Sequence, residues 1–234
     1  MKLQTTTSHE FANAKYKCAV LPVGTIEAHG THLPLGTDNI IPDHIAERIE
    51  KEFGDDVLVM PGVMYGHTYY LEKWHGSINI PTPVLREYLV SIGREIKRNG
   101  IDKILFLNGH GGNDSVLYDV AETLSYEGVT SRIISWWLEY EDEIRHIAPG
   151  TGHAGEDETS LVLEASPESV DMAHAHDGPE WPHFCSVSLS QRDKIVPQGV
   201  TGNGTKGTRE KGKKLFTLIT TNILDTMREL MESE

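Results

Sequence analysis

The chain has 234 residues, 38% of them hydrophobic and 24% charged, a length and composition that allow it to bury a full core as a single domain. Its 21 Lys and Arg against 35 Asp and Glu give a net charge of −14, which argues against nucleic acid and anionic membrane surfaces as partners. No apolar run approaches the roughly 20 residues that cross a bilayer, and the N-terminal residues lack the apolar region of a signal peptide, so we expect a cytoplasmic protein.

The first half of the chain predicts strands that alternate with helices. Cys18–Val23 is a short apolar run that ends at a glycine, which is typical of a buried strand running into a loop. Asn39–Phe53 carries apolar residues at helical spacing and is followed by a glycine that would end the helix. Val57–Met60 is the next strand, and Thr82–Asn99 is a helix with proline in its first turn.

The second half continues this alternation. Lys103–Leu107 is apolar without polar alternation, as expected of a strand that is covered on both faces, and Ser131–Trp136 is a further strand. Residues 167–206 are predicted to be irregular, with one candidate strand at Cys185–Leu189. Helices are predicted at three places: Asp114–Tyr126, Glu156–Ala165 and Gly207–Met231.

Strands and helices that alternate in this way predict an α/β fold. We expect a single domain over residues 1–234, with a mainly parallel sheet as the middle layer of a three-layer α/β/α structure. Open parallel sheets bind their ligands in the loops beyond the carboxyl ends of the strands. Functional residues are therefore expected in the loops that follow the predicted strands.

The loop after the first strand carries Glu27, His29 and Asp38. In an extended segment, residues i and i+2 point to the same side, so Glu27 and His29 can face a common point. Asp38 stands where the next helix begins, and an aspartate there can serve as an N-cap that stabilises the helix by about 1 kcal/mol. Taken alone, a helix cap and a solvated loop are the simpler interpretations of these three residues.

The loop after the strand Lys103–Leu107 is Asn108–Asn113, with the sequence NGHGGN. Its glycines let the backbone turn sharply and bring the His110 imidazole into the crevice. A glycine-rich loop ahead of a helix can instead bind phosphate, but this one lacks the Lys and Ser/Thr of a P-loop. The histidine embedded in the loop favours a ligand role.

A third polar cluster, His153–Ser160, opens the helix predicted from Glu156. The helix dipole favours acids in a first turn, which gives its three carboxylates a purely structural explanation. Imidazoles combined with several carboxylates, however, suit zinc, manganese or iron. Two such metals ~3.5–4 Å apart need one bridging carboxylate and about two further ligands each. Five residues satisfy that requirement: Glu27, His29, Asp38, His110 and Glu156.

These motifs resemble those of the creatininase (creatinine amidohydrolase) family. LPVGTIEAHGTHLPLGTDN resembles the first family motif, NGHGGN the second and HAGEDETSLVL the third. The stretches Tyr65–Ile78 and Gly199–Leu215 also contain segments similar to the family's. The resemblance therefore covers nearly the whole chain.

The resemblance implies two divalent metal ions, zinc, manganese or iron, with Asp38 as the bridging ligand. In creatininase the last ligand is a glutamate two residues after the histidine of the second motif, where this chain has Gly112. We predict that Glu156 replaces it, and that Glu158 either supports the site or is the alternative ligand. Four ligands are implied by their positions in the motifs: Glu27, His29, Asp38 and His110.

The resemblance implies a metal-dependent amidohydrolase that cleaves a C–N amide, cyclic amide or formamide bond through a hydroxide bridging the two metals. His153 matches the family's catalytic histidine and would pass a proton to the leaving nitrogen. Relatives with the NGHGGN loop suggest alternative activities on a formylamino-pyrimidine nucleotide, a peptide or a cyclic ketone. A non-catalytic metal-binding sensor is an alternative of another class, which His153 beside a full ligand set argues against.

The substrate is expected to be a small molecule other than creatinine. Creatininase encloses creatinine with a tryptophan shortly before the third-motif histidine, where this chain has Thr151–Gly152. Trp136 and Trp137 could line a pocket, although tryptophans at a strand end more often pack in a core. Four residues are predicted to contact the substrate: His67, Ser77, Gly111 and Trp136.

Two further expectations concern charged substrates and assembly. A nucleotide substrate would need cations for its phosphate, and Lys206 and Arg209 are the candidates nearest the family motifs, with a solvated helix start as the simpler interpretation. The family forms closed oligomers, hexamers in creatininase itself. The resemblance therefore implies a homo-oligomer.

Overall fold

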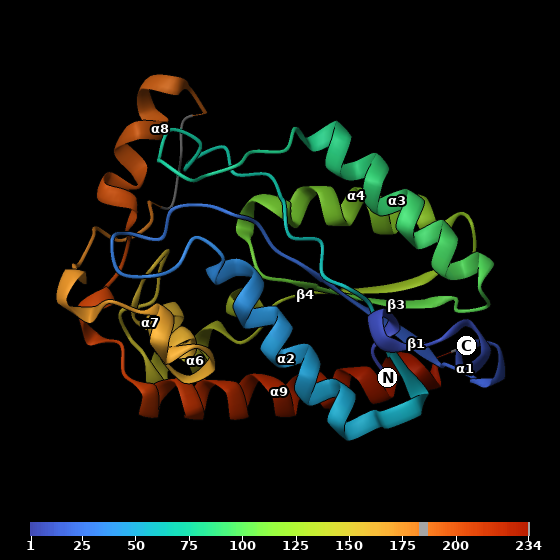
Figure 1. Cartoon of the computed structure of the whole chain (residues 1–234). Helices are drawn as coiled ribbons and strands as arrows, with labels where there is room; N and C mark the ends of the chain where they lie inside the picture. The colour runs from blue at the N-terminus through green and yellow to red at the C-terminus, as the bar shows by residue number, and fades with distance from the viewer. Residues whose placement is uncertain (183–186, 234) are drawn as a thin grey trace.

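The computed structural model describes residues 1–182 and 187–233, and its strands form one parallel sheet (Figure 1). The sheet has four strands: β1 (Cys18–Val23), β2 (Val57–Val59), β3 (Lys103–Asn108) and β4 (Thr130–Ser135). Their spatial order is β2-β1-β3-β4, and each neighbouring pair is parallel. The predicted parallel sheet is therefore confirmed, with β1 and β3 at its centre.

The two central strands are buried along almost their whole length. Every residue of β1 is buried, and so is every residue of β3 after Lys103. Their sequences are continuously apolar because helices cover both faces of the sheet. Val23 of β1 lies opposite Asn108 of β3, so the two strands end at the same edge and the loops that follow them begin side by side.

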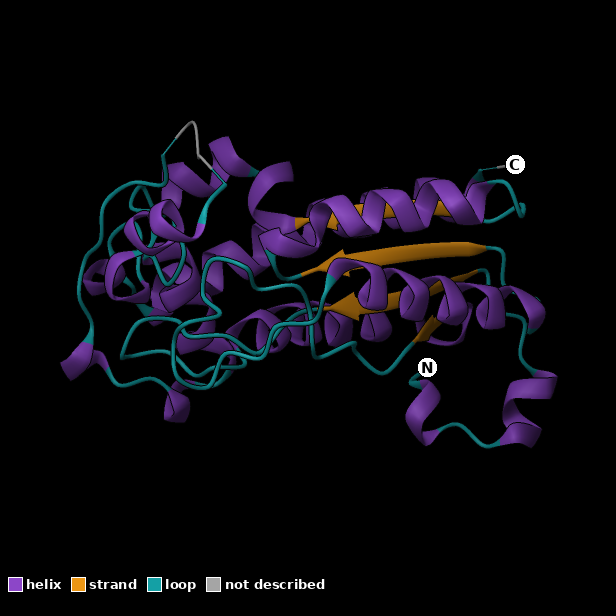
Figure 2. Cartoon of the chain, turned by 90° about the horizontal axis from the view of Figure 1, so that it is seen from above, coloured by secondary structure: helices purple, strands orange, loops and turns teal. Residues whose placement is uncertain are grey.

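Helices form a layer on each side of the sheet. Figure 1 shows α3 (Thr82–Arg98) and α4 (Asp114–Ser125) on one face, with α2 (Thr37–Phe53) and α9 (Arg209–Glu232) on the other. Each face has its own apolar core, one packed against α3 and α4 and the other against α2 and α9. Seen from above, most loops gather beyond the arrowheads of the strands (Figure 2). The predicted three-layer α/β/α arrangement is confirmed.

Helix α9 shows why one face of a helix becomes part of the core. Its apolar residues recur every three or four positions, which places them on one face. Burying each such side chain stabilises the fold by roughly 1.5–3 kcal/mol. Thr208 caps the helix by accepting a hydrogen bond from the Lys211 N–H at 3.3 Å. The buried face is made of Leu215, Phe216, Ile219, Ile223, Met227 and Leu230.

The irregular region and the short helices differ from the prediction. Trp136, predicted to end the last strand, instead begins α5 (Trp136–Glu139). Residues 167–206 contain the unpredicted helix α8 (Leu189–Ile195). The candidate strand Cys185–Leu189 falls partly on residues 183–186, which lie outside the described residues; residues 187–188 are not in a strand and Leu189 starts α8.

Elsewhere the predicted helices and strands are found with small shifts at their ends, and α7 (Glu156–Ala165) has the predicted bounds. Two short helices were not predicted: α1 (Ser8–Asn13) and α6 (Glu141–Ile147). Within residues 1–182 and 187–233, no helix combines the length and the hydrophobicity needed to cross a membrane.

Candidate metal centre

Three loops meet beyond the carboxyl edge of the sheet. The loop after β1 carries Glu27 and His29 and leads into α2, the loop after β3 carries His110, and the turn before α7 carries His153. The first two loops start side by side because of the register between β1 and β3. The candidate residues therefore lie together at the edge that the parallel-sheet rule predicted.

Asp38 lies at the centre of this cluster. Its Oδ1 is 2.9 Å from Nε2 of His29, and its Oδ2 is 3.0 Å from Nδ1 of His110. Helix α2 begins at Thr37 with Gly36 as its N-cap, so Asp38 is inside the first turn and is not the cap. The cap interpretation is wrong because the helix starts earlier, which turns the carboxylate of Asp38 toward the two histidines.

Two glutamates complete the cluster. Glu27 is fully buried, and its Oε1 lies 3.4 Å from Nδ1 of His110 and 3.5 Å from Nδ1 of His153. Oε2 of Glu158 lies 3.6 Å from Nε2 of His29. Ligand atoms therefore converge from three separate parts of the chain. They form three overlapping groups: Glu27, Asp38 and His110; His29, Asp38 and Glu158; and Glu27, His29 and His153.

Two buried oxygens in this cluster lack a hydrogen-bond donor. Both carboxylate oxygens of Glu27 are buried and accept no hydrogen bond from the described residues. Burial of a charged carboxylate is costly unless a hydrogen bond, a counter-charge or a metal compensates for it. The donor set, carboxylate oxygens and imidazole nitrogens, fits zinc, manganese or iron. The orphaned oxygens are thus positioned as metal ligands would be.

In the metal-free protein, the carboxylates hold protons on two histidines. Burial alone would lower the pKa of His29, but the adjacent Asp38 raises it to about 10. Partial burial would lower the pKa of His110 too, but the carboxylates of Glu27 and Asp38 raise it to about 9. For the carboxyl of Glu158, burial has the opposite effect and raises the pKa to about 8. Metal ions would take the place of these protons, since only deprotonated side chains act as ligands.

Backbone carbonyls orient the histidines. The Nε2–H of His110 donates to the carbonyl of His67 at 2.9 Å, which leaves Nδ1 facing Asp38. Nδ1 of His29 lies 3.1 Å from the Glu27 carbonyl, and a carbonyl can only accept, so this nitrogen carries a hydrogen and Nε2 faces Asp38. Such outer contacts are typical of metal-binding histidines.

His153 differs from the other two histidines. Its Nε2 lies 2.8 Å from the carbonyl of Ala28 and must donate to it, so the neutral ring has its lone pair on Nδ1, toward Glu27. Burial and the neighbouring charge of His29 lower the pKa of His153 to about 3. A neutral imidazole with a free nitrogen facing the cluster can accept and return a proton.

Glu156, predicted as the fifth ligand, lies outside the cluster. Its carboxylate accepts a hydrogen bond from the Gly150 N–H at 2.7 Å and pairs with Lys211 on α9. Successive residues of a helix point about 100° apart, so Glu156 and Glu158 face nearly opposite ways. The carboxylate that lies in the cluster is therefore that of Glu158, whereas the one predicted there was that of Glu156.

We expect Glu158→Gln and Glu156→Gln to have different effects. Glu158→Gln removes a charged ligand atom and should lower the bound metal to about one equivalent per chain or less. Glu156→Gln should keep the metal but lower the melting temperature, because the Lys211 ammonium loses its buried partner. Elemental analysis and thermal unfolding distinguish the two variants. Loss of metal in Glu156→Gln alone would restore the original assignment.

Gly112 of the second motif has no room for a side chain. A side chain at Gly112 would collide with the carbonyl oxygen of His67 and with the His110 ring. That carbonyl is the group that orients His110. A carboxylate at position 112 would displace this carbonyl, whereas the carboxylate of Glu158 reaches the cluster from α7.

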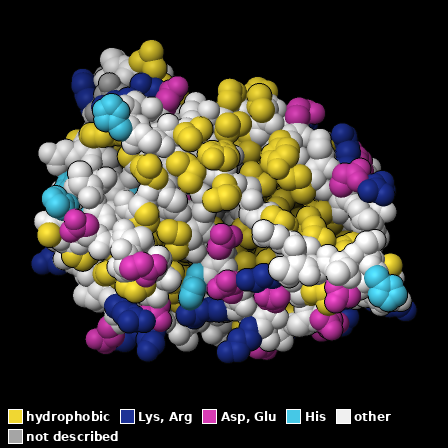
Figure 3. Space-filling view, in the orientation of Figure 1, with side chains coloured by type: hydrophobic (Ala, Val, Ile, Leu, Met, Phe, Trp, Pro, Cys, Tyr) yellow, Lys and Arg dark blue, Asp and Glu magenta, His cyan; other side chains and the backbone are white. Residues whose placement is uncertain are grey.

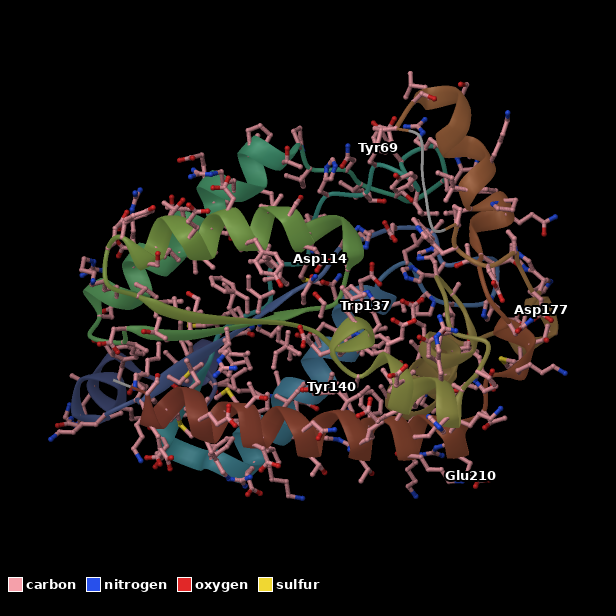
Figure 4. The ribbon with its side chains drawn as sticks, turned by 180° about the vertical axis from the view of Figure 1, so that it is seen from behind. Tyr69, Asp114, Trp137, Tyr140, Asp177 and Glu210 are labelled. Carbon is pink, nitrogen blue, oxygen red and sulfur yellow. The ribbon has the colours of Figure 1, made fainter. Side chains whose placement is uncertain are left out.

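A polar network that was not predicted supports the His110 loop. Asn108 accepts a hydrogen bond from the His110 N–H at 3.1 Å and donates to Asp114 at 2.8 Å. Asp114, at the start of α4 (Figure 4), also accepts a 2.5 Å hydrogen bond from Ser135 at the end of β4. The positions of these residues at strand ends and beside the NGHGGN loop were the feature of the sequence that could have identified them.

The residues predicted to contact the substrate differ in burial and in the contacts that they make. The Ser77 hydroxyl accepts a hydrogen bond from the Ala28 N–H at 2.9 Å, so it braces the loop after β1. His67 is half-buried and Gly111 is exposed. Trp136 is fully buried in the core and cannot line a pocket, whereas its half-buried neighbour Trp137 lies near Gly111 (Figure 4). The substrate assignment of Trp136 is therefore wrong.

Known proteins share both the sequence pattern and the fold. The model of a family described as creatininase, creatinine amidohydrolase, matches residues 4–227. The chain is 29% identical over 233 residues to the mycofactocin precursor peptide peptidase of Mycolicibacterium smegmatis (strain ATCC 700084 / mc(2)155), covering 97% of this chain and 90% of that protein. It is 26% identical over 232 residues to the creatinine amidohydrolase of Pseudomonas putida, covering 90% and 88%.

A solved structure of a manganese form of creatininase has the same fold, with a TM-score of 0.87 over 99% of each chain at 24% identity. The family model spans nearly the whole length of the sequence, and the strand-end motifs that carry the resemblance meet in one buried cluster. This protein therefore belongs to the creatininase family of hydrolases.

Proposed function

We propose that the protein is a binuclear metal-dependent hydrolase that cleaves C–N bonds of amides, cyclic amides or formamides. One observation carries this proposal: the two oxygens of Asp38 face two different histidines, His29 and His110. A carboxylate shared in this way is the bridging ligand that two-metal hydrolytic sites require. The alternative, a carboxylate paired with a single histidine, would not support two ions.

Each ion would have three ligands from the chain. Glu27 and His110 would hold one ion, His29 and Glu158 the other, and Asp38 both. Divalent ions held in this way polarise a substrate carbonyl and lower the pKa of water from 15.7 to roughly 7. Carboxylate and imidazole donors are compatible with zinc, manganese or iron.

The role proposed for His153 follows from its hydrogen bonds. The Ala28 carbonyl holds the hydrogen on Nε2, so Nδ1 is the nitrogen available to the reacting groups. Nδ1 would take a proton from the attacking water and deliver it to the leaving nitrogen. Burial lowers the pKa of His153, which keeps its imidazole neutral and leaves the Nδ1 lone pair free.

The names of two relatives support C–N cleavage. One is a peptidase and the other an amidohydrolase, and both names denote hydrolysis of a C–N bond. A phosphorylated substrate has weaker support, because the guanidinium of Arg209, one of the two cations considered for a phosphate, already pairs with Glu164 at 2.8 Å. We therefore favour a substrate without a phosphate group.

A homo-oligomer is also part of the proposal. Hydrophobic side chains gather over the loop before α3 and over the start of α3 in Figure 3. Exposed apolar patches of this kind mark interaction surfaces in soluble proteins. The exposed large hydrophobic residues in these segments are Met64, Tyr65, Ile78, Val84 and Tyr88.

A hydrolysis screen tests the proposed reaction. The protein, loaded with zinc or manganese, is incubated with short peptides, simple amides, formamides and cyclic amides. We expect at least one class to yield a new amine, or for cyclic amides a product heavier by one water, as detected by mass spectrometry. Chelator-treated protein should be inactive. Turnover confined to cyclic ketones or esters would contradict C–N specificity.

A further inference from the structure

The turn that carries His153 has little regular structure of its own. Residues 150–155 lie between α6 and α7, and Ala154 has a φ of 52°, in the left-handed region that non-glycine residues rarely adopt. The Ala154 N–H donates to Oε2 of Glu158 at 2.6 Å. Because a strained turn of this kind persists only when its surroundings hold it, other contacts must fix the place of His153.

Thr201 makes those contacts. The His153 N–H donates to the Thr201 hydroxyl at 2.8 Å, and the Thr201 N–H donates to the His153 carbonyl at 2.8 Å. Thr201 is completely buried. Gly152 permits this close approach, since a side chain there would collide with Thr201. Both backbone polar groups of His153 are thus held by one residue.

The segment around Thr201 is itself anchored on both sides. The Gly199 carbonyl accepts a hydrogen bond from the Gly30 N–H at 2.8 Å, one residue beyond His29. The Asn203 N–H donates to the Gly150 carbonyl at 2.9 Å, at the start of the His153 turn. Figure 1 shows this segment descending from α8 past the start of α7 toward α9. It joins the loop after β1 to the turn that carries His153.

We propose that Thr201 is a positioning residue for catalysis: its hydroxyl fixes the His153 backbone so that Nδ1 faces the ligand cluster. The effect on turnover rests on the proposed function, whereas the effect on the His153 backbone does not. An imidazole displaced by about 1 Å loses roughly 10²-fold in rate. The Thr201 hydroxyl therefore affects turnover without touching the substrate or a metal ligand.

The test compares Thr201→Val, which keeps the shape but removes the acceptor, with Thr201→Ser, which keeps the hydroxyl. Thr220→Val is the matched control, because Thr220 is buried on α9 and its hydroxyl has no hydrogen-bond partner among the described residues. Thr201→Ala is a second deletion of the hydroxyl, should the valine variant fail to fold. All variants are studied as zinc-loaded full-length protein.

Hydrogen–deuterium exchange of the His153 amide is the first readout. We expect exchange about tenfold faster in Thr201→Val, corresponding to the loss of one hydrogen bond, and wild-type exchange in Thr201→Ser and Thr220→Val. The second readout is turnover, where kcat of Thr201→Val should fall by about 10–10²-fold with KM and zinc content unchanged, and Thr201→Ser should restore it.

The two readouts separate two kinds of failure. Wild-type exchange of the His153 amide in Thr201→Val would overturn the inference, and so would an unchanged kcat. If wild-type protein hydrolyses no substrate while Thr201→Val still exchanges faster, the backbone clamp stands and the proposed function is what fails.

Discussion

Replacing His153 with alanine is expected to lower kcat by about 10²–10⁴-fold, the contribution of a general acid–base group. The metal content should stay at the wild-type value, because His153 belongs to neither of the two ligand groups that share Asp38. The fold should also persist, since the side-chain hydrogen bond that is lost joins His153 to the Ala28 carbonyl at the edge of the site. Steady-state kinetics and elemental analysis of the same preparation provide the measurement.

The same measurements distinguish a proton-transfer role of His153 from a role as a metal ligand. Its Nδ1 also lies in a possible ligand group with Glu27 and His29. If His153→Ala loses metal together with activity, His153 is a metal ligand and its role in proton transfer is contradicted. His153→Gln, which retains a polar side chain, should be as inactive as the alanine variant because an amide cannot take up the proton.

Asp38→Ala should abolish binding of both metals. The substitution removes the one carboxylate that faces both His29 and His110, so each ligand group falls from three chain ligands to two. We expect the metal content to fall from about two equivalents to well below one, and activity to fall below detection. Elemental analysis after buffer exchange measures the first effect.

The matched control for Asp38→Ala is Asp43→Ala, five residues further along α2 on an exposed position. This variant should retain both metals and full activity. Asp38→Ala protein that still binds two equivalents would show that Asp38 does not bridge. Unfolding of the variant would be recognised by circular dichroism and is not expected, because the metal-free cluster loses only one of its three carboxylates.

The fold could be predicted because its strands are buried on both faces. Cys18–Val23 and Ile104–Leu107 are continuous apolar runs only because helices cover both sides of the sheet. The same strands end at one edge, so the rule for parallel sheets located Glu27, His29 and His110. The hydrophobic pattern identifies where these strands end, and the candidate residues follow those ends.

The choice between Glu156 and Glu158 could not be made from the sequence. Both stand in the first turn of α7, and which one faces the cluster depends on how the helix is rotated about its axis. That rotation is fixed by long-range packing of α7 on α9, including the pair of Glu156 with Lys211. Hydrophobic periodicity carries no information on a contact 55 residues away.

Thr201 was missed for a different reason. The segment that contains it is held by backbone hydrogen bonds and close glycine contacts, such as Gly178 against Val200 and Gly202 against Thr151. Such contacts leave no periodic pattern of apolar side chains. The clustered glycines in GVTGNG were the visible signal, and only the folded structure shows which backbone they approach.

The most direct test of the binuclear site is the metal content of wild-type protein purified without chelator, measured by elemental analysis near pH 8. Metal ions must displace the protons that His29 and His110 hold up to about pH 10 and 9 in the metal-free protein, so mildly alkaline conditions favour full occupancy. Two bound ions should give about two equivalents of zinc, manganese or iron per chain. Wild-type protein that contains no metal and cannot be reconstituted would contradict the proposed centre.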